Sequence, residues 1–501
     1  MGFGIEVFLL IGAILLLCWL IFSKPKNYPP GPIKWPIVGN TRFISSEGQF
    51  YKLMSMVQKE YGDVVGLFTF RTPIVVISGL DAIREACFRD DLSGRPGNSI
   101  HKLIYEGKEH GIVNTSGETW KAQRRFTLQH LRDLGFGKRS LESIAHEEIQ
   151  AVFEDIDDIS GGQKKGFPNP VNFHDILGGT SINVLWHIIA GKRYEHRDPE
   201  FKELITAVQK LLQLGTPAGN IMSSFPFLAK LFPRITGFSN MVSHRAPIHK
   251  FLMDEIDAHR KTIDYDHQRD FIDIYLSEIE RQKNNPQTSF TERQLKQVCA
   301  EMFVAGTDTT LNTLSFAMLY MVLYPDAQSK VQQELDEVVG KDRLPSLEDR
   351  PKLPYVDATI SEILRCSSIA PTALAHSPQT RETSINFRGY QIPKGTRVLF
   401  NLYGLHHDPL LWKSPDEFIP ERFLQKNGEQ VQREALMPFG AGKRVCLGES
   451  LARNNVFLFF TAILQRYSLR VPDGHPTPTK LPEGKTVLFP KAFTIKVNLR
   501  S

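Results

Sequence analysis

The strongest chemical signal in the sequence is the segment from Phe439 to Gly448, which contains one cysteine among glycines and basic residues. Cys446 lies just before a helical pattern over 449–464, where the helix dipole and free backbone amides stabilise a thiolate. A thiolate there can bind iron, and the glycines at 440, 442 and 448 let the backbone approach a flat ligand closely. A lone cysteine is more often an inert core residue, but that interpretation leaves the glycines and Arg444 unexplained.

A second cluster of candidate residues, Ala305 to Thr310, lies inside the longest helical pattern of the chain. Gly306 costs about 1 kcal/mol relative to alanine in a helix interior, and threonine hydroxyls compete for backbone carbonyls. The cluster therefore indicates either a kinked core helix or a groove in which a small ligand lies against Ala305 and Gly306. In the second interpretation, Asp308 and Thr309 handle protons.

Glu362 and Arg365 are three residues apart on a helical pattern that follows Pro354, so they share one face. An isolated Glu/Arg pair at this spacing is usually a solvated ion pair that contributes little to the stability of the fold. Arg422, in the segment 420–423, supplies a second guanidinium that can join them in a buried triad. We interpret this triad as structural and not catalytic.

Most of the elements that must position these residues are expected to be helices. The longest is expected to end at Tyr324 and to begin at one of two capping boxes, Ser289/Glu292 or Thr291/Gln294. Alternating patterns predict short strands over 64–68, 74–78 and 398–402, and the polar stretch 281–288 predicts a surface loop. The predicted fold class is mainly α with a minor β portion.

Composition limits the class of protein further. The chain of 501 residues is 41% hydrophobic and 23% charged, which is typical of a folded protein with a sizeable core. Its net charge of +5 is small for this length and excludes a global signature of nucleic-acid binding. The five cysteines are widely scattered, which favours a reducing compartment over a disulfide framework or a zinc site.

The N-terminal segment is continuously apolar from Val7 to Phe22 and approaches the ~20 residues that span a bilayer. A cleaved signal peptide is the competing interpretation, but no basic segment precedes the apolar run and no small-residue cleavage site follows it. The lysines at 24, 26 and 34 place the rest of the chain in the cytosol by the positive-inside rule. We predict a membrane anchor over 1–23, a proline-rich hinge over 24–36 and a catalytic domain over 37–501.

Taken together, these motifs resemble those of the cytochrome P450 superfamily. Its haem-binding signature is similar to Phe439, Gly442, Arg444, Cys446 and Gly448. Its oxygen-activation motif is similar to 305–310, and its helix pair and third triad member are similar to Glu362, Arg365 and Arg422. Trp120, Arg124 and the prolines of 29–32 also match the family, so the resemblance spans essentially the whole chain. The segment 123–139 resembles the second family of animal microsomal enzymes, including its arthropod branch.

The resemblance implies a P450 fold, preceded here by a single transmembrane helix, with haem b (iron protoporphyrin IX) bound through the thiolate of Cys446. It implies that Ala305 and Gly306 lie against the haem and that Thr309 and Asp308 deliver protons for oxygen activation. The residues expected to hold the haem propionates are Trp120, Arg124, His376, Arg444 and Arg95. The expected reaction is insertion of one oxygen atom into a small lipophilic substrate, by hydroxylation or epoxidation. A terpenoid or hormone precursor is the most specific hypothesis.

The resemblance also implies partners and a location. Pocket-lining stretches of the family correspond to 99–111, 211–221, 303–307 and 369–374. Electrons are expected from a separate NADPH-dependent flavoprotein reductase, with cytochrome b5 as a second candidate donor. The basic residues of the expected docking surface are Lys121, Arg124, Arg125, Arg132, Lys138 and Arg139. They form either a docking surface for that acidic partner or an ordinary solvated face.

The expected location is the endoplasmic reticulum membrane, with the catalytic domain in the cytosol. The apolar segment 224–232 is either a further lipid contact or core.

Three alternatives stay open at this point. Some relatives rearrange peroxides or dehydrate substrates without using oxygen, although such members tend to lose the pair that Asp308 and Thr309 retain here. A second alternative is a non-enzymatic haem protein that carries electrons or senses a gas. A third, from another class, is a cysteine hydrolase that uses Cys446 with His406 or His407.

Overall fold

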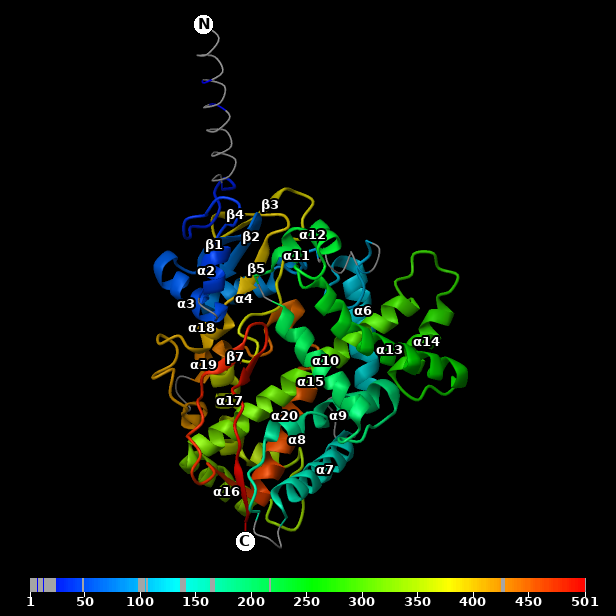
Figure 1. The fold of residues 1–501 in the computed structure, drawn as a ribbon, viewed down its shortest axis with the longest axis vertical. Coiled ribbons are helices and arrows are strands. Elements are labelled where there is room, and N and C mark those ends of the chain that lie inside the picture. The colour runs from blue at the N-terminus through cyan, green and yellow to red at the C-terminus, as the bar shows by residue number, and fades with distance from the viewer. Residues whose placement is uncertain are drawn as a thin grey trace.

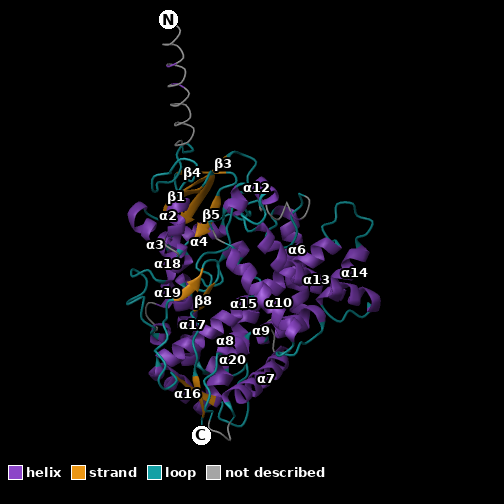
Figure 2. Ribbon diagram, in the orientation of Figure 1, coloured by secondary structure: helices purple, strands orange, loops and turns teal. Residues whose placement is uncertain are grey.

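The computed structural model describes residues 24–46, 49–97, 104, 107–135, 141–162, 167–215, 218–424 and 429–500, together with Val7 and Gly12. Helices make up most of this part of the chain, and the strands form only small sheets (Figure 2). The prediction of a mainly α fold with a minor β portion is confirmed.

The helices surround one long helix, α15 (Glu292–Leu323), which runs through the middle of the molecule (Figure 1). In chain order the other α-helices are α2 (Thr41–Ser46), α3 (Phe50–Tyr61), α4 (Leu80–Phe88), α6 (Gly117–Asp133), α7 (Glu142–Ser160), α8 (Phe173–Leu177), α9 (Thr180–Ala190), α10 (Pro199–Leu214), α11 (Ile221–Ser224), α12 (Pro226–Leu231), α13 (Phe238–Thr262), α14 (Phe271–Arg281), α16 (Pro325–Val338), α17 (Pro354–Ser367), α18 (Leu402–His406), α19 (Glu429–Ala435) and α20 (Glu449–Arg466). The described 3-10 helices are η1 (Asp90–Leu92), η4 (Arg350–Lys352), η5 (Pro420–Phe423) and η6 (Gly442–Arg444).

The largest described sheet has the strand order β1-β2-β5, with β1 (Val64–Thr69) antiparallel to β2 (Thr72–Ile77) and β2 parallel to β5 (Arg397–Phe400). These strands lie close to the three predicted segments. β5 ends before Leu402 because Asn401 caps α18, its side chain accepting a hydrogen bond from the Gly404 amide. Three two-stranded sheets complete the β portion: β3 (Ser384–Phe387) with β4 (Tyr390–Pro393), β6 (Tyr467–Arg470) with β9 (Lys496–Leu499), and β7 (Pro482–Gly484) with β8 (Leu488–Pro490).

Helix α15 begins as one of the two predicted capping patterns indicates, although only half of the box forms. The Thr291 hydroxyl oxygen accepts a hydrogen bond from the Gln294 amide at 3.2 Å. The Gln294 side chain does not return to the cap, because its amide is engaged with both backbone groups of Gly111. The helix stays continuous through 305–310 and ends at Leu323, just before the proline that starts α16.

The predicted hinge, 24–36, does not stand apart from the globule along its whole length. The Tyr28 hydroxyl donates to the Ile74 carbonyl at 2.8 Å, and the Gly66 amide donates to the Pro30 carbonyl at 2.7 Å. A Cβ on Gly31 would lie 2.1 Å from the Gly66 oxygen, so this close approach requires glycine. The middle of the expected hinge is therefore fixed against β1.

The predicted anchor, 1–23, lies outside the described residues apart from Val7 and Gly12. Among the helices of the described residues, none is both long enough and apolar enough to cross a membrane.

The triad predicted from sequence comes together in the core, where α17 meets η5. Glu362 accepts two hydrogen bonds from Arg365, at 2.7 and 2.8 Å, and one from Arg422 at 3.0 Å. Both guanidinium groups donate their remaining hydrogens to backbone carbonyls between residues 406 and 417. The pair on α17 is completely buried, so its charges are compensated by each other, by Arg422 and by these carbonyls and not by water.

Replacing Glu362 with glutamine should lower the free energy of unfolding by about 3–5 kcal/mol, because two buried guanidinium groups lose their shared anion. Glu280→Gln is the matched control: Glu280 also pairs with a cation three residues away, but both side chains are more than half exposed. Urea unfolding of both variants measures the difference. Equal effects of the two substitutions would show that burial does not set the importance of the triad.

Candidate active site

The loop that carries Cys446 is held by contacts on both of its sides. The Cys446 amide donates to the Phe439 carbonyl at 2.9 Å, which closes the loop just before α20. Gly442 has a φ of +67°, and a Cβ there would lie 2.1 Å from the Cys87 carbonyl oxygen at the end of α4. This glycine therefore permits close packing of the loop on α4. Its predicted contact with a flat ligand stays a prediction.

The Cys446 side chain is exposed although the protein surrounds it closely enough to raise the pKa of its thiol through desolvation. The backbone amides of Gly448 and Glu449 and the charge of Arg124 act in the opposite direction. The backbone amides therefore lower the pKa of the thiol, as the sequence predicts, but burial raises it by more. A bound cation at this uncovered thiol would reverse the direction of the pKa shift.

Three guanidinium groups gather beside this loop. Arg124, on α6, donates to the Val445 carbonyl at 2.6 Å, and Arg444 donates to the carbonyls of three residues between 93 and 115. Arg95 donates to the carbonyls of residues 113, 374 and 375. Burial and the neighbouring arginines lower the pKa of Arg444 to about 8, and mainly burial lowers that of Arg95 to about 10. Carbonyl dipoles alone do not compensate this concentration of positive charge.

Two further predicted residues lie in the same cluster. The Trp120 ring lies against Arg444, with the guanidinium carbon 3.8 Å from the ring centroid. Its buried indole nitrogen has no hydrogen-bond partner in the described structure. His376 Nδ1 lies 3.3 Å from Arg95, and burial followed by the charges of Arg95 and Arg444 lowers the pKa of His376 well below its usual value. The cluster therefore contains an unused donor and several cations, which suits an anionic ligand.

Glu301, on α15, organises this region and was missed by the sequence analysis. Its carboxylate accepts hydrogen bonds from the amides of Ile112 and Val113, at 2.6 and 2.8 Å, and from the side chains of Asn114 and Gln297. The backbone carbonyls of the same loop hold Arg444 and Arg95. A Cβ on Gly111 would lie 2.2 Å from the Glu301 carboxylate. No local pattern predicts its contact with the loop, since nearly 190 residues separate Glu301 from Ile112, Val113 and Asn114.

In the cluster 305–310 on α15, some residues pack against a neighbouring helix and others lie on an uncovered face. Ala305 is exposed and Thr309 half-buried, although α15 is otherwise largely buried around them. A Cβ on Gly306 would lie 2.4 Å from the Leu185 side chain, so this glycine lets α9 approach. The Thr309 hydroxyl donates to the Ala305 carbonyl at 2.8 Å. The uncovered face therefore belongs to Ala305 and Thr309, whereas Gly306 has a packing role.

Asp308 lies beside this face and is buried. It accepts a hydrogen bond from the Asn312 side chain at 2.9 Å. Burial raises the pKa of its carboxyl to about 6, with the Asn312 contact acting in the opposite direction. A carboxyl with such a pKa both gives and takes a proton readily near neutral pH.

The candidate partners for a cysteine hydrolase lie elsewhere. The two ring nitrogens of His406 are engaged with the Ser368 hydroxyl, at 2.8 Å, and the Met437 amide, at 3.0 Å. His407 Nδ1 contacts the Tyr403 carbonyl. Among the described contacts, neither histidine reaches Cys446, so the geometry gives no support to the hydrolase alternative.

Comparison with known proteins gives consistent matches. The model of the Cytochrome P450 family matches residues 29–497, which include every candidate residue described above. Farnesoate epoxidase of Bombyx mori is 35% identical over 495 residues, which cover 96% of this chain and 97% of that protein. Cytochrome P450 2J2 of Homo sapiens is 37% identical over 487 residues, covering 96% and 93%. Cytochrome P450 2B19 of Mus musculus is 38% identical over 480 residues, covering 94% of each chain.

Replacing Gly442 with alanine should disrupt the Cys446 loop, because a new methyl group would collide with the α4 backbone. Gly440→Ala is the matched control, since Gly440 also has a positive φ, of +73°, but open space where its Cβ would lie. The fraction of purified protein that retains cofactor, together with thermal unfolding, measures the difference. Equal losses in both variants would mean that backbone strain, and not contact with α4, sets the requirement for glycine.

Proposed function

The chain belongs to the cytochrome P450 family, with haem b as its cofactor, and on this premise we propose that it oxidises a small lipophilic substrate at a membrane, using electrons from an NADPH-dependent flavoprotein reductase. The observation that carries the proposal is the meeting, around one loop, of an uncovered thiol, a half-buried arginine cluster and an indole donor without a partner among the described residues. Family membership makes the chain a monooxygenase, and these residues indicate how it holds its cofactor.

The residues present fit haem. Cys446 would supply the thiolate ligand to the iron, and the cations Arg95, Arg124 and Arg444 would balance the two propionates. The Trp120 indole would donate to a propionate, which gives its buried nitrogen the partner that the protein does not provide. When bound, haem supplies oxygen activation, in which two electrons and two protons cleave dioxygen so that one atom enters the substrate and the other leaves as water.

Side chains on α15 are proposed to deliver the protons. Thr309 presents a hydroxyl on the uncovered face of the helix, and Asp308 lies next to it with a pKa near 6. The hydroxyl donates its single proton to the Ala305 carbonyl in the structure, and it would turn this donor from the carbonyl toward a reacting group to pass a proton on. Retention of this acid and alcohol pair favours a monooxygenase over the oxygen-independent isomerase or dehydratase. The same pair has no use in an electron carrier or a gas sensor.

The basic face of α6 is proposed as the docking surface for the reductase. Lys121, Arg125 and Arg132 are exposed, whereas Arg124 turns inward to the Cys446 loop. The predicted members Lys138 and Arg139 lie outside the described residues. Electrons arriving at this helix would enter beside the loop that holds the thiolate. Cytochrome b5 is proposed as a second donor for the same acidic-to-basic contact.

The proposed substrate is a small lipophilic molecule, with a terpenoid as the most specific candidate. Support comes from the similarity to farnesoate epoxidase, whose name indicates oxidation of a terpenoid acid, and from the expected pocket-lining stretches. Of these stretches, 99–103, 105–106 and 216–217 lie outside the described residues. Incubation of the purified protein with reductase, NADPH, oxygen and a series of terpenoids tests the proposal. Consumption of NADPH without any oxygenated terpenoid would refute the substrate class.

Membrane attachment is proposed to use the anchor over 1–23 in the endoplasmic reticulum membrane, with the catalytic domain in the cytosol. It is also proposed to use α12. Phe227 is 59% exposed, Leu231 is 65% exposed, and Phe232 just beyond the helix is also exposed, whereas Ala229 is buried. These apolar side chains favour lipid contact over core, which were the two interpretations that the sequence left open.

Thr309→Ala should leave haem content and substrate affinity nearly intact but reduce the product formed per NADPH by roughly an order of magnitude or more, with hydrogen peroxide appearing instead. Thr313→Ala is the matched control, because its hydroxyl donates to the Thr309 carbonyl in the same way but lies in the core. Product, peroxide and NADPH are measured together. Unchanged coupling in Thr309→Ala would exclude the proton-delivery role.

Removal of residues 1–23 should leave a protein that still floats with liposomes, and Phe227→Asp with Phe232→Asp should weaken that flotation severalfold, because charge opposes insertion of α12 into lipid. Leu410→Asp is the control, since Leu410 is an even more exposed apolar residue in a loop after α18. If both substitutions weakened flotation equally, general surface hydrophobicity and not α12 would explain the lipid contact.

A further inference from the structure

Arg397 is the first residue of β5 and lies on an otherwise apolar face of the sheet. Because side chains alternate along a strand, Arg397 shares its face with Leu399. Leu399 packs in an apolar cluster that also contains Ala218, before α11, and Leu488, on β8. A charged group among such neighbours is costly unless it has a partner of opposite charge.

The structure provides no such partner. Arg397 is half-buried and makes no hydrogen bond or ion pair with any described residue. Burial alone lowers the pKa of its guanidinium, with no contribution from a nearby charge. Other inward-facing arginines, such as Arg95 and Arg365, donate to carboxylates or to several backbone carbonyls. Arg397 therefore differs in that none of its donors is used.

The chain covers the guanidinium only in part. Gly219 lies directly against it, with a φ of +82°, and a Cβ there would be 3.2 Å from Nε and 3.4 Å from Cζ of Arg397. Gly219 belongs to 211–221, one of the stretches expected to line the substrate pocket. A glycine at this point keeps the unused donors accessible from that stretch.

We propose that Arg397 binds the carboxylate of a lipophilic acid substrate, whose apolar chain extends from this end into the pocket. This inference rests on the proposed function and names its substrate class. The planar guanidinium matches a carboxylate bidentately, and the apolar residues around β5 suit the chain that follows. The acid would supply the missing anion, and Arg397 would determine specificity by distinguishing acids from their neutral esters.

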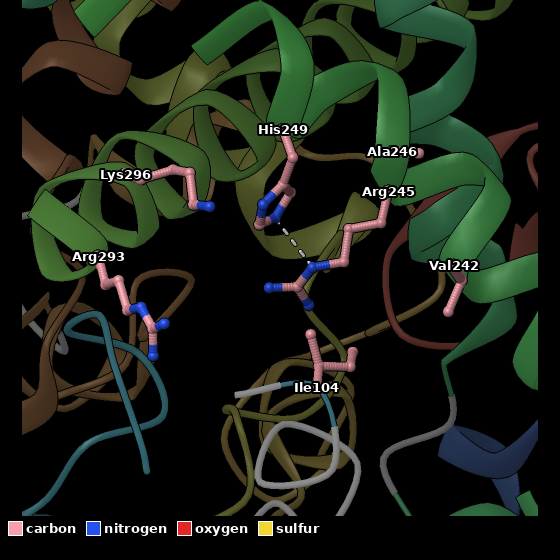
Figure 3. A pocket seen from close by; sticks show the side chains of 7 residues that line it. All are labelled: Ile104, Val242, Arg245, Ala246, His249, Arg293 and Lys296. Carbon is pink, nitrogen blue, oxygen red and sulfur yellow. Dashed lines mark hydrogen bonds between the residues drawn. The ribbon is translucent and has the colours of Figure 1, made fainter. Parts of the chain in front are cut away.

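A second basic site, between α13 and α15, could also bind an anion and therefore provides the control. A hollow of about 340 Å³ lies between α13 and α15, and Figure 3 shows basic side chains extending into it from both helices. Among its described lining residues four are basic and none is acidic: Ile104, Val242, Arg245, Ala246, His249, Arg293 and Lys296. Arg245 is held by His249 and Gln297, each at 2.9 Å. Lys296 is half-buried and has no acidic partner among the described residues.

The test compares farnesoate with methyl farnesoate, and dodecanoate with methyl dodecanoate, on the purified holoenzyme. Dissociation constants are measured by calorimetry and by the absorption change of the haem on ligand binding. The wild-type protein should bind each acid at least tenfold more tightly than its ester at neutral pH. Arg397→Gln should weaken acid binding by tenfold or more without changing ester binding, and Arg397→Lys should restore part of the loss. Lys296→Gln, which also removes one cation, should change neither.

Several results would overturn the inference. They are acid binding no tighter than ester binding in the wild type, equal losses for acid and ester in Arg397→Gln, or a loss of acid binding in Lys296→Gln but not in Arg397→Gln. The last result would assign the carboxylate to the hollow between α13 and α15. Failure of the proposed function is separate, because it would appear as intact acid binding without any oxygenated product when reductase and NADPH are supplied.

Discussion

Positive charge gathered on half-buried side chains beside the Cys446 loop is the constraint on which the site depends. Arg95, Arg124 and Arg444 converge there, and desolvation lowers the pKa of each guanidinium, with repulsion between arginines adding to the shift for Arg95 and Arg444. Backbone carbonyls hold the three guanidinium groups in place but do not neutralise them. A dianionic cofactor would resolve this conflict, which is why we propose that the same arrangement favours haem binding. Glu301 contributes by fixing the loop whose carbonyls orient Arg444 and Arg95.

Helix α15 connects the arginine cluster with the residues proposed to deliver protons. Its N-terminal half carries Glu301, which holds the loop, and its middle carries Ala305 and Thr309 on an uncovered face. Helix α20 packs on α15 and begins just after Cys446. Because both helices belong to one core, the position of the thiolate relative to Thr309 is set by packing and does not depend on a flexible loop.

Sequence patterns predicted the mainly helical fold, the long helix and the three strands of the larger sheet, because these features depend on local periodicity. They also indicated the triad, whose contacts the structure shows, and they singled out Cys446, Asp308 and Thr309 through distinctive local motifs, although the roles of these three residues stay proposals. The patterns did not predict the contacts of Glu301, because its partners in 112–114 are distant in the sequence. They also did not predict that Arg397 has no partner among the described residues, because this depends on segments far from it in the chain. Nor did they indicate that Gly306 and Gly442 each permit close contact with another helix, α9 or α4, while their expected contacts with a ligand stay predictions.

The absorption spectrum of the reduced protein with carbon monoxide tests the central claim, that Cys446 is the thiolate ligand in a charge-balanced haem site. The wild-type protein should give the red-shifted Soret band of an axial thiolate, and Cys446→Ala should lose it. Cys299→Ala, which removes a buried cysteine of α15, should keep the band. A red-shifted band that persists in Cys446→Ala would contradict the account.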